Sequence, residues 1–144
     1  LPALRELYLS GNRISELGDG IRHAQSLRVL AIDSNFLVTL PQWMAAARQL
    51  RKLNLNRNKL ETLAMFPWNS PWSYCYNPEE QRIEFQNTKT GEKTKHGEGI
   101  PRPLDRWHWL EHLAYLSLRW NQLTDLPQGI GKLANLEVST QHVL

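Results

Sequence analysis

Two histidines and a glutamate in the last third of the chain have a spacing that can bind zinc. His108, Glu111 and His112 form the pattern H-x-x-E-H, which on a helix presents both histidines as metal ligands. A catalytic zinc also needs a third protein ligand and an open coordination position. Leu110 and Leu113 keep a three-residue apolar spacing through this segment, so the histidines fall between buried positions and face outward. We therefore expect no metal site here.

No other group of residues has the spacing of a catalytic site. The chain has no glycine-rich phosphate loop, no Ser/His/Asp arrangement and no paired buried carboxylates, which are the patterns that nucleotide-binding and hydrolytic sites require. Its one cysteine, Cys75, has no histidine motif around it, and we expect it to be a small buried strand residue. The sequence therefore predicts neither an enzyme nor a cofactor site.

The chain is organised around a repeated leucine spacing. The stretch from Leu113 to Leu133 follows the pattern L-x-x-L-x-L-x-x-N-x-L-x-x-L-P-x-x-I-x-x-L. The same pattern begins at Leu4, Leu27 and Leu50, which are 23 residues apart, and is then interrupted until Leu113. A fixed period of this length indicates a solenoid, in which each unit buries its apolar side against its neighbours.

This pattern resembles that of the leucine-rich repeat family, and its L-P-x-x-I-x-x-L form is similar to that of the intracellular Ras-suppressor and Scribble-like group. The resemblance covers residues 1–63 and 104–138. It implies an α/β fold, a parallel β-sheet horseshoe in which each L-x-x-L-x-L segment is a short strand with inward-pointing leucines. The asparagines at the fixed polar position are expected to turn the chain and to stack as a ladder. They are Asn12, Asn35, Asn58 and Asn121.

The residues between the leucines are expected to form the concave surface of the solenoid, with one column for each repeat position. Aromatic and arginine side chains are enriched among the residues that dominate protein interfaces. Six residues are therefore our candidates for protein binding. They are Tyr8, Lys52, Arg57, Tyr115, Arg119 and Trp120. The alternative is that most of them belong to an ordinary solvated sheet surface.

The basic residues are not predicted to bind nucleic acid. They are densest between Arg48 and Lys59, where they alternate with leucines and point in several directions. A nucleic-acid site would combine such a cluster with stacking aromatic residues in a basic domain. The net charge of the chain is only +3, from 17 basic and 14 acidic residues. We therefore expect a solvated face, and neither a nucleic-acid nor a membrane partner.

Residues 64–103 interrupt the repeats and are expected to form a small β-domain. The distance from Leu50 to Leu113 is 63 residues, which is one 23-residue period plus 40. Ordered loops rarely exceed about 15 residues, so the added length indicates a domain. Residues 73–76 and 82–86 have the composition of strands, and turn-forming residues follow each of them.

This insertion resembles a WW domain, a three-stranded module that binds proline-rich peptides. The resemblance assigns Trp72, Phe85 and Asn87 to the structural side of the sheet, with Trp72 in contact with Phe85. The two aromatic residues that grip a proline ring in that family are replaced by Glu84 and Lys95. Since a polyproline helix docks on aromatic walls, we expect a WW-like fold that does not bind proline. The alternative is an irregular β-hairpin unrelated to that family.

The composition favours a reducing, cytoplasmic compartment. A single cysteine excludes an internal disulfide, and no Asn-x-Ser/Thr sequon is present. No run of 18 apolar residues could form a transmembrane helix. The chain starts in the middle of a repeat, and Leu136 opens a fifth copy that places Ser139 at a leucine position. Because an uncapped solenoid end is apolar, we expect flanking sequence beyond both ends.

These features predict a protein-protein interaction module in three parts: repeats one to three in residues 1–63, the insertion in 64–103, and repeat four with the start of a fifth in 104–144. It would be a scaffold or a subunit of a larger intracellular complex that binds protein through the concave face and the insertion. The alternative is a regulatory repeat segment of a signalling protein that engages a small GTPase, because similar repeats do so.

Overall fold

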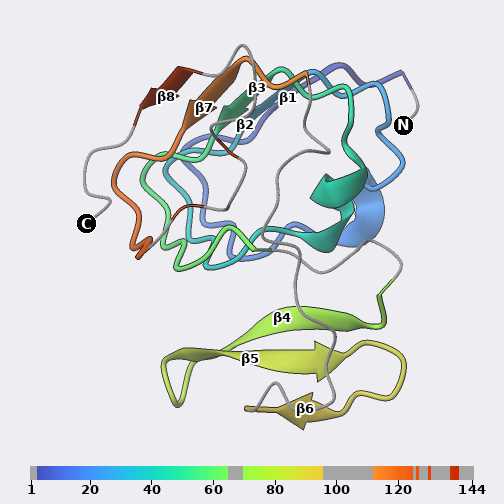
Figure 1. Cartoon of the computed structure of the whole chain (residues 1–144), viewed down its shortest axis with the longest axis vertical. Helices are drawn as coiled ribbons and strands as arrows, with labels where there is room; N and C mark the ends of the chain where they lie inside the picture. Colours follow the sequence, from blue (N-terminus) through green and yellow to red (C-terminus); the bar gives the residue numbers. More distant parts are fainter. Residues whose placement is uncertain are drawn as a thin grey trace.

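The computed structural model describes residues 3–64, 70–95, 112–124, 126, 130 and 137–139 of the chain. They form a parallel sheet of five strands in the order β1-β2-β3-β7-β8 and an antiparallel sheet of three strands in the order β4-β5-β6. Figure 1 shows the small sheet below the solenoid, with β4 as its nearest strand. The predicted fold, a leucine-rich-repeat solenoid with a small antiparallel insertion, is confirmed.

One short strand from each repeat builds the parallel sheet. The strands are β1 (Glu6–Tyr8), β2 (Val29–Ala31), β3 (Lys52–Asn54), β7 (Tyr115–Ser117) and β8 (Glu137–Ser139). Leu7 lies opposite Leu30, Leu30 opposite Leu53, and Leu53 opposite Leu116. Because the same repeat position recurs on each of these four strands, every column across them contains one position of the repeat.

The strand leucines fill one continuous core. Leu53, Leu55 and Leu116 have no exposed surface, and Leu118 keeps only 2% of its own. All four belong to a single hydrophobic cluster that includes residues of the second, third and fourth repeats. Burying one leucine side chain contributes about 1.5–3 kcal/mol. The prediction that these four leucines share a core is confirmed.

Short 3-10 turns return the chain on the other side of this core. The turns η1 (Asp19–Ile21) and η2 (Gln42–Ala46) lie side by side in Figure 1, on the side of the solenoid that faces the small sheet. Met44 and Ala47 occupy the last apolar positions of the second repeat, and both are buried. No helix in the described ranges is long and apolar enough to cross a membrane.

The predicted asparagine ladder is present and links each repeat to the one before it. The side-chain amide of Asn58 donates to the carbonyl oxygen of Ile32 in the preceding repeat at 3.0 Å, and its oxygen accepts from the N–H of Leu37 at 3.0 Å. Asn35 and Asn121 make the equivalent bonds. Buried backbone groups must find such partners, so the ladder fixes the register between repeats.

The insertion leaves the solenoid continuous. β3 and β7 pair directly through Leu53 and Leu116, although the insertion separates them in the chain. The ladder also crosses this junction, because Asn121 accepts a 3.0 Å hydrogen bond from the N–H of Leu60. The prediction that the sheet runs from the third repeat straight into the fourth is confirmed.

The fifth strand pairs in a register that the repeat spacing did not predict. A 23-residue period placed Ser139 at the position of Leu116. In the structure Val138 lies opposite Leu116, and Ser139 lies opposite Ser117. The fifth repeat therefore follows one residue early. The backbone register thus gives Val138 the leucine position of the repeat, whereas a register one residue later would give it to Ser139.

Two turns capped by asparagine define the small sheet. Its strands are β4 (Trp72–Asn77), β5 (Arg82–Asn87) and β6 (Lys93–Thr94). The side-chain oxygen of Asn77 accepts hydrogen bonds from two N–H groups of the turn before β5, and that of Asn87 does the same before β6. Asparagine favours turns through such bonds. Both predicted strands and both turns are confirmed.

Candidate protein-binding surface

Two exposed tyrosines lie on the first and fourth strands of the parallel sheet. Pairing between the strands places Tyr115 of β7 opposite Lys52 of β3, in the same repeat position as Glu6 of β1. Tyr8 occupies the repeat position two residues further along β1. Tyr8 is 64% exposed and Tyr115 is 36% exposed. Strands about 4.8 Å apart place β1 and β7 about 14 Å from each other. One partner of ordinary size can therefore contact both tyrosines.

Between these strands, polar side chains bond to one another across the sheet. The carboxylate of Asp33 accepts hydrogen bonds from side chains of both neighbouring repeats. The side-chain oxygen of Asn56 accepts from the Ser117 hydroxyl and from the backbone N–H of Arg119, both at 2.7 Å. Ser117, which the sequence placed on the concave surface, is buried. The polar side chains at the centre of the sheet therefore already have hydrogen-bond partners within the chain.

The eighth repeat position adopts a left-handed backbone conformation in the first four repeats. The φ angle is +71° at Gly11, +57° at Ser34, +52° at Arg57 and +60° at Trp120. Glycine adopts this conformation freely, whereas other residues there cost roughly 1–2 kcal/mol. Arg57 and Trp120 therefore lie in turns just beyond the strands.

Five of the six predicted residues come together on the third and fourth repeats. The backbone N–H of Arg57 donates to the carbonyl oxygen of Arg119 at 2.8 Å, and Trp120, which is 52% exposed, follows directly. Lys52 lies opposite Tyr115. The three cations are exposed, and none forms an ion pair within the described ranges. They can therefore pair with a partner without breaking an existing contact.

The sixth predicted residue, Tyr8, lies apart from this group on β1. Its hydroxyl donates a 2.9 Å hydrogen bond to the Glu6 carboxylate, and this bond raises the pKa of Tyr8 above its usual value of 10.0. The hydroxyl therefore stays protonated at neutral pH. Tyr8 can therefore contact a partner through its exposed ring.

An exposed phenylalanine extends the surface beyond the predicted residues. Phe36 is 45% exposed, and the Nζ atom of Lys59 lies 4.9 Å from the centre of its ring. Phe36 and Lys59 directly follow the ladder residues Asn35 and Asn58, so they occupy equivalent positions of adjacent repeats. The sequence analysis missed Phe36, although a residue between the ladder asparagine and the next leucine has to face outward.

The predicted core residues of the insertion share one face of the small sheet. Trp72 lies opposite Asn87, and Tyr74 lies opposite Phe85. Opposite residues and alternate residues of a strand point to the same side, so all four belong to one face. The rings of Tyr74 and Phe85 are 5.6 Å apart between centroids. Burial raises the pKa of Tyr74 to about 12. Phe85 is thus the direct partner of Tyr74 and lies diagonally across from Trp72.

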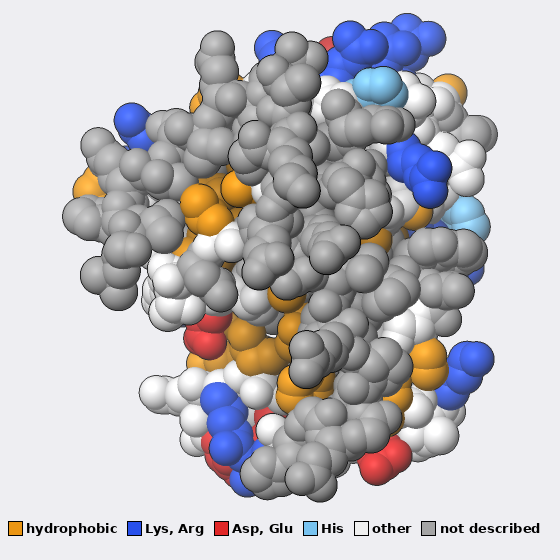
Figure 2. All heavy atoms as spheres, in the orientation of Figure 1, with side chains coloured by type: hydrophobic (Ala, Val, Ile, Leu, Met, Phe, Trp, Pro, Cys, Tyr) orange, Lys and Arg blue, Asp and Glu red, His pale blue; other side chains and the backbone are white. Residues whose placement is uncertain are grey.

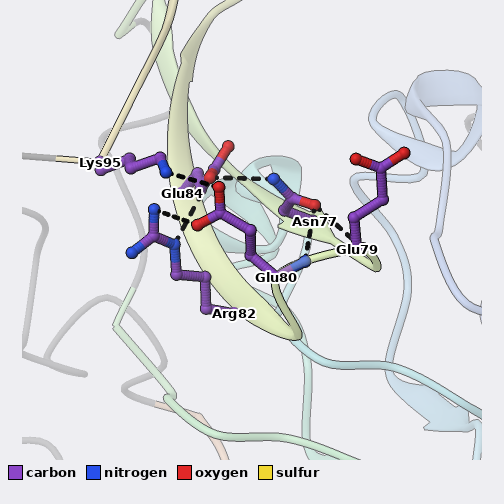
Figure 3. A network of polar contacts seen from close by, with 6 residues as sticks. All are labelled: Asn77, Glu79, Glu80, Arg82, Glu84 and Lys95. Carbon is purple, nitrogen blue, oxygen red and sulfur yellow. Dashed lines mark hydrogen bonds and ion pairs between the residues drawn. The ribbon is translucent and has the colours of Figure 1, made fainter.

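The other face of the small sheet carries a network of charges (Figure 3). Glu84 is only 5% exposed and accepts a 3.0 Å hydrogen bond from Asn77, while Arg82 lies between Glu84 and Glu80. Lys95 donates to Glu80, and this bond lowers the pKa of that carboxyl. The positions that the WW resemblance gives to proline-gripping aromatics, Glu84 and Lys95, therefore lie within ion pairs.

A cavity of 830 Å³ lies between the return side of the solenoid and β4. Trp43 from η2 and Cys75 and Tyr76 from β4 contribute to its walls, and Figure 2 shows hydrophobic side chains in the hollow between the two parts. The amide of Gln42 donates to the carbonyl oxygen of Ser70 across this space at 2.9 Å. Cys75 is half-buried, not fully buried as expected, and burial raises the pKa of its thiol.

The zinc-like spacing lies mostly outside the described residues. His108 and Glu111 are not among them, and His112 is exposed. Within the described ranges, no group of three or more His, Cys, Asp and Glu side chains is placed to hold a metal ion. The surface around Trp120 and Arg57 therefore remains the candidate site.

Comparison with protein families agrees with the repeat geometry. Two family models, both described as leucine-rich repeat, match residues 2–60 and residues 112–133. A solved leucine-rich-repeat protein of Leptospira interrogans aligns with 97% of this chain and 26% of its own, with a TM-score of 0.62 and 27% sequence identity. Both matched segments are therefore leucine-rich repeats, a class of structure that generally mediates protein-protein interactions.

Curated relatives share sequence with parts of this chain. Podocan-like protein 1 of Mus musculus is 44% identical over 61 residues, which are 42% of this chain and 11% of that protein. Podocan of Mus musculus is 29% identical over 132 residues, 90% of this chain and 19% of that protein. A probable serine/threonine-protein kinase of Dictyostelium discoideum is 36% identical over 61 residues, 42% of this chain and 5% of that protein. The chain thus spans under a fifth of each relative's length.

Proposed function

We propose that this chain is a protein-binding module of a larger intracellular assembly, and that it binds its partner through the sheet and turns of the third and fourth repeats. The observation that carries the proposal is the arrangement of Arg57, Arg119 and Trp120. They lie in adjacent turns, with Tyr115 and Lys52 on the strands that precede them. We name these five residues the turn surface.

The chemistry of the turn surface suits a protein partner. Tryptophan, tyrosine and arginine are the residues that most often dominate the binding energy of an interface. Here their backbones are fixed by the sheet and by the asparagine ladder, so little conformational freedom is lost on binding. The exposed cations Lys52, Arg57 and Arg119 favour a partner whose contact area is acidic.

The test compares partner capture by matched variants of the whole chain. A Trp120→Ala, Arg119→Ala variant removes two groups of the turn surface, whereas an Arg48→Ala, Gln49→Ala variant removes two exposed residues from a return segment. Covalent cross-linking in cell extract followed by mass spectrometry should give partners that the parent and the return-segment variant share. These partners should be lost from the turn-surface variant. Equal recovery by all three chains would refute the proposal.

We also propose that the insertion is a WW-like sheet without a proline-binding groove. Its three antiparallel strands and the face shared by Trp72, Phe85 and Asn87 support the relation. The ion-paired Glu84 and Lys95 support the loss of binding. Titration with a Pro-Pro-x-Tyr peptide should therefore give no measurable affinity, because each lost aromatic contact removes about 1–3 kcal/mol. Micromolar binding would show that the groove has been assigned to the wrong residues.

A second candidate function is regulation within a signalling protein. The match to a Dictyostelium discoideum protein named as a probable serine/threonine-protein kinase favours it, since that match lies in a small part of a much longer protein. In this case the turn surface would engage a small GTPase. Binding of a GTPase panel, loaded with either nucleotide, to the parent and to the Trp120→Ala, Arg119→Ala variant separates this candidate from a nucleotide-independent scaffold.

A further inference from the structure

Three arginines occupy the same position in successive repeats, directly before their strands. The N–H of Arg28 donates to the carbonyl oxygen of Arg5 at 2.7 Å, and the N–H of Arg51 donates to that of Arg28 at 2.8 Å. Neighbouring strands are about 4.8 Å apart. These bonds therefore place one arginine at the start of each of three adjacent strands, at that spacing. We name Arg5, Arg28 and Arg51 the arginine column.

Within the part of the chain that the structure describes, no ion pair neutralises the arginine column. All three side chains are exposed, and within the described ranges none forms an ion pair or a side-chain hydrogen bond. Glu6, which directly follows Arg5, accepts a hydrogen bond from the Tyr8 hydroxyl. In Figure 2, Lys and Arg side chains gather along the upper edge of the solenoid.

Folding does not require arginine at this position. The fourth repeat has Ala114 there, and its N–H makes the same backbone bond, to the Arg51 carbonyl oxygen at 2.8 Å. Like charges at paired positions of adjacent strands are destabilising. The column therefore opposes folding slightly, and an anionic partner would relieve this repulsion.

We propose that the arginine column binds an acidic polypeptide helix that lies across the strands with one carboxylate on each turn. A helix advances about 5.4 Å per turn, against about 4.8 Å per strand. Over three strands the difference accumulates to about 1.2 Å, which the flexible arginine side chains can absorb. The planar guanidinium matches a carboxylate through two parallel hydrogen bonds.

The residues beside the column favour a polypeptide over a nucleic acid. The next repeat position holds Glu6 beside Arg5, Val29 beside Arg28 and Lys52 beside Arg51. No aromatic side chain therefore lies between these three arginines for a nucleic-acid base to stack on. The arginine column shares no residue with the turn surface, although Lys52 of that surface directly follows Arg51.

The test measures peptide binding by fluorescence anisotropy with the whole chain. The probe is a labelled alanine-based helical peptide with glutamates at i, i+4 and i+8. Its control is an isomer with glutamates at i, i+2 and i+5, which point to different sides of the helix. Arg28→Gln should weaken binding of the probe about fivefold, the upper range for one exposed ion pair. The Arg5→Gln, Arg28→Gln, Arg51→Gln variant should abolish it, whereas Arg48→Gln should leave it unchanged.

Three results would overturn the proposal. Equal affinity for the two peptides would reject the helical spacing, and equal binding by the parent and the Arg28→Gln variant would reject the column. Tighter, column-dependent binding of a single-stranded oligothymidine would assign the column to nucleic acid. Circular dichroism of each variant checks its folding, and the single Arg28→Gln substitution, at an exposed residue, keeps the test valid if the triple variant is unfolded.

Discussion

At the scale of single residues, Asn58 shows how this fold uses a buried polar side chain. The side-chain amide of Asn58 forms hydrogen bonds with backbone groups of two repeats. This one residue therefore closes the turn of its own repeat and joins that turn to the preceding repeat. The apolar columns set which side chains of each strand are buried, because a one-residue slip would turn the leucines to the other face. The asparagine bonds add a directional link between the turns of adjacent repeats, and the leucines supply most of the stabilising energy.

We expect Asn58→Ala to lower the free energy of unfolding by about 2–3 kcal/mol, because it leaves the buried N–H of Leu37 without a partner. Urea denaturation measures the change. The control is Asn12→Ala in the first repeat, where the side chain is exposed and donates only to Leu9 and Ser10 of its own repeat. A loss at Asn12 as large as the loss at Asn58 would contradict the role of the inter-repeat bond.

Arg57 illustrates a residue whose backbone conformation does not suit its type. Because its φ angle is +52°, Arg57→Gly should raise the free energy of unfolding by up to about 1 kcal/mol. Lys52→Gly, at an exposed strand position of the same repeat, should instead lower it by about 0.5–1 kcal/mol. Thermal denaturation of both variants tests the pair. If glycine destabilises both positions equally, the strain at Arg57 has no energetic consequence.

At the scale of elements, the sequence predicted the strands well because the repeat imposes them. Six or more template positions recur in each of four copies, so the identity of any single residue hardly matters. The two strands and the turns of the insertion were predictable for a different reason. Asn77 and Gly91 are turn-forming residues, and Gly91 indeed has a φ angle of +75°.

The features that the sequence did not predict depend on positions at which the individual repeats differ from one another. Val138 pairs with Leu116 at a separation of 138 − 116 = 22 residues, one fewer than the 23-residue period. The template also does not show that the eighth position is left-handed, because Gly11 and Trp120 have opposite conformational preferences. Phe36 was not predictable from the strand columns, because it follows the ladder residue Asn35 and belongs to neither the strand nor the turn position directly after it.

The strand β7 provides the sharpest test of the shared core. Leu116 is fully buried and lies between β3 and β8, so Leu116→Ala should cost roughly 2–5 kcal/mol. Solenoid repeats are stabilised mainly by their neighbours, and hydrogen exchange should therefore increase more in residues 112–124 than in 27–40. Leu4→Ala is the control, since Leu4 only packs against the edge of the core. Uniform acceleration along the chain would show that the repeats unfold as one unit.

At the scale of the whole molecule, the insertion interrupts the chain of the solenoid but not its sheet or its asparagine ladder. The pairing of Leu53 with Leu116 and the hydrogen bond from Leu60 to Asn121 both join the third repeat directly to the fourth. The small sheet has its own ring pair, its own turns and its own ion pairs. The hydrogen bond from Gln42 to Ser70 connects it to the return side of the solenoid.

Removing residues 64–103 should therefore leave a folded solenoid. The deletion joins Leu63 to Leu104 and restores the 23-residue distance between Leu50 and Leu113. The shortened chain should keep its sheet signal in circular dichroism and unfold cooperatively in urea, because the core leucines and the asparagine ladder are retained. Adding Leu116→Ala to the deletion should again cost roughly 2–5 kcal/mol. If the deletion alone abolishes cooperative unfolding, the small sheet is part of the solenoid's core, and the domain boundaries at residues 64 and 103 are wrong.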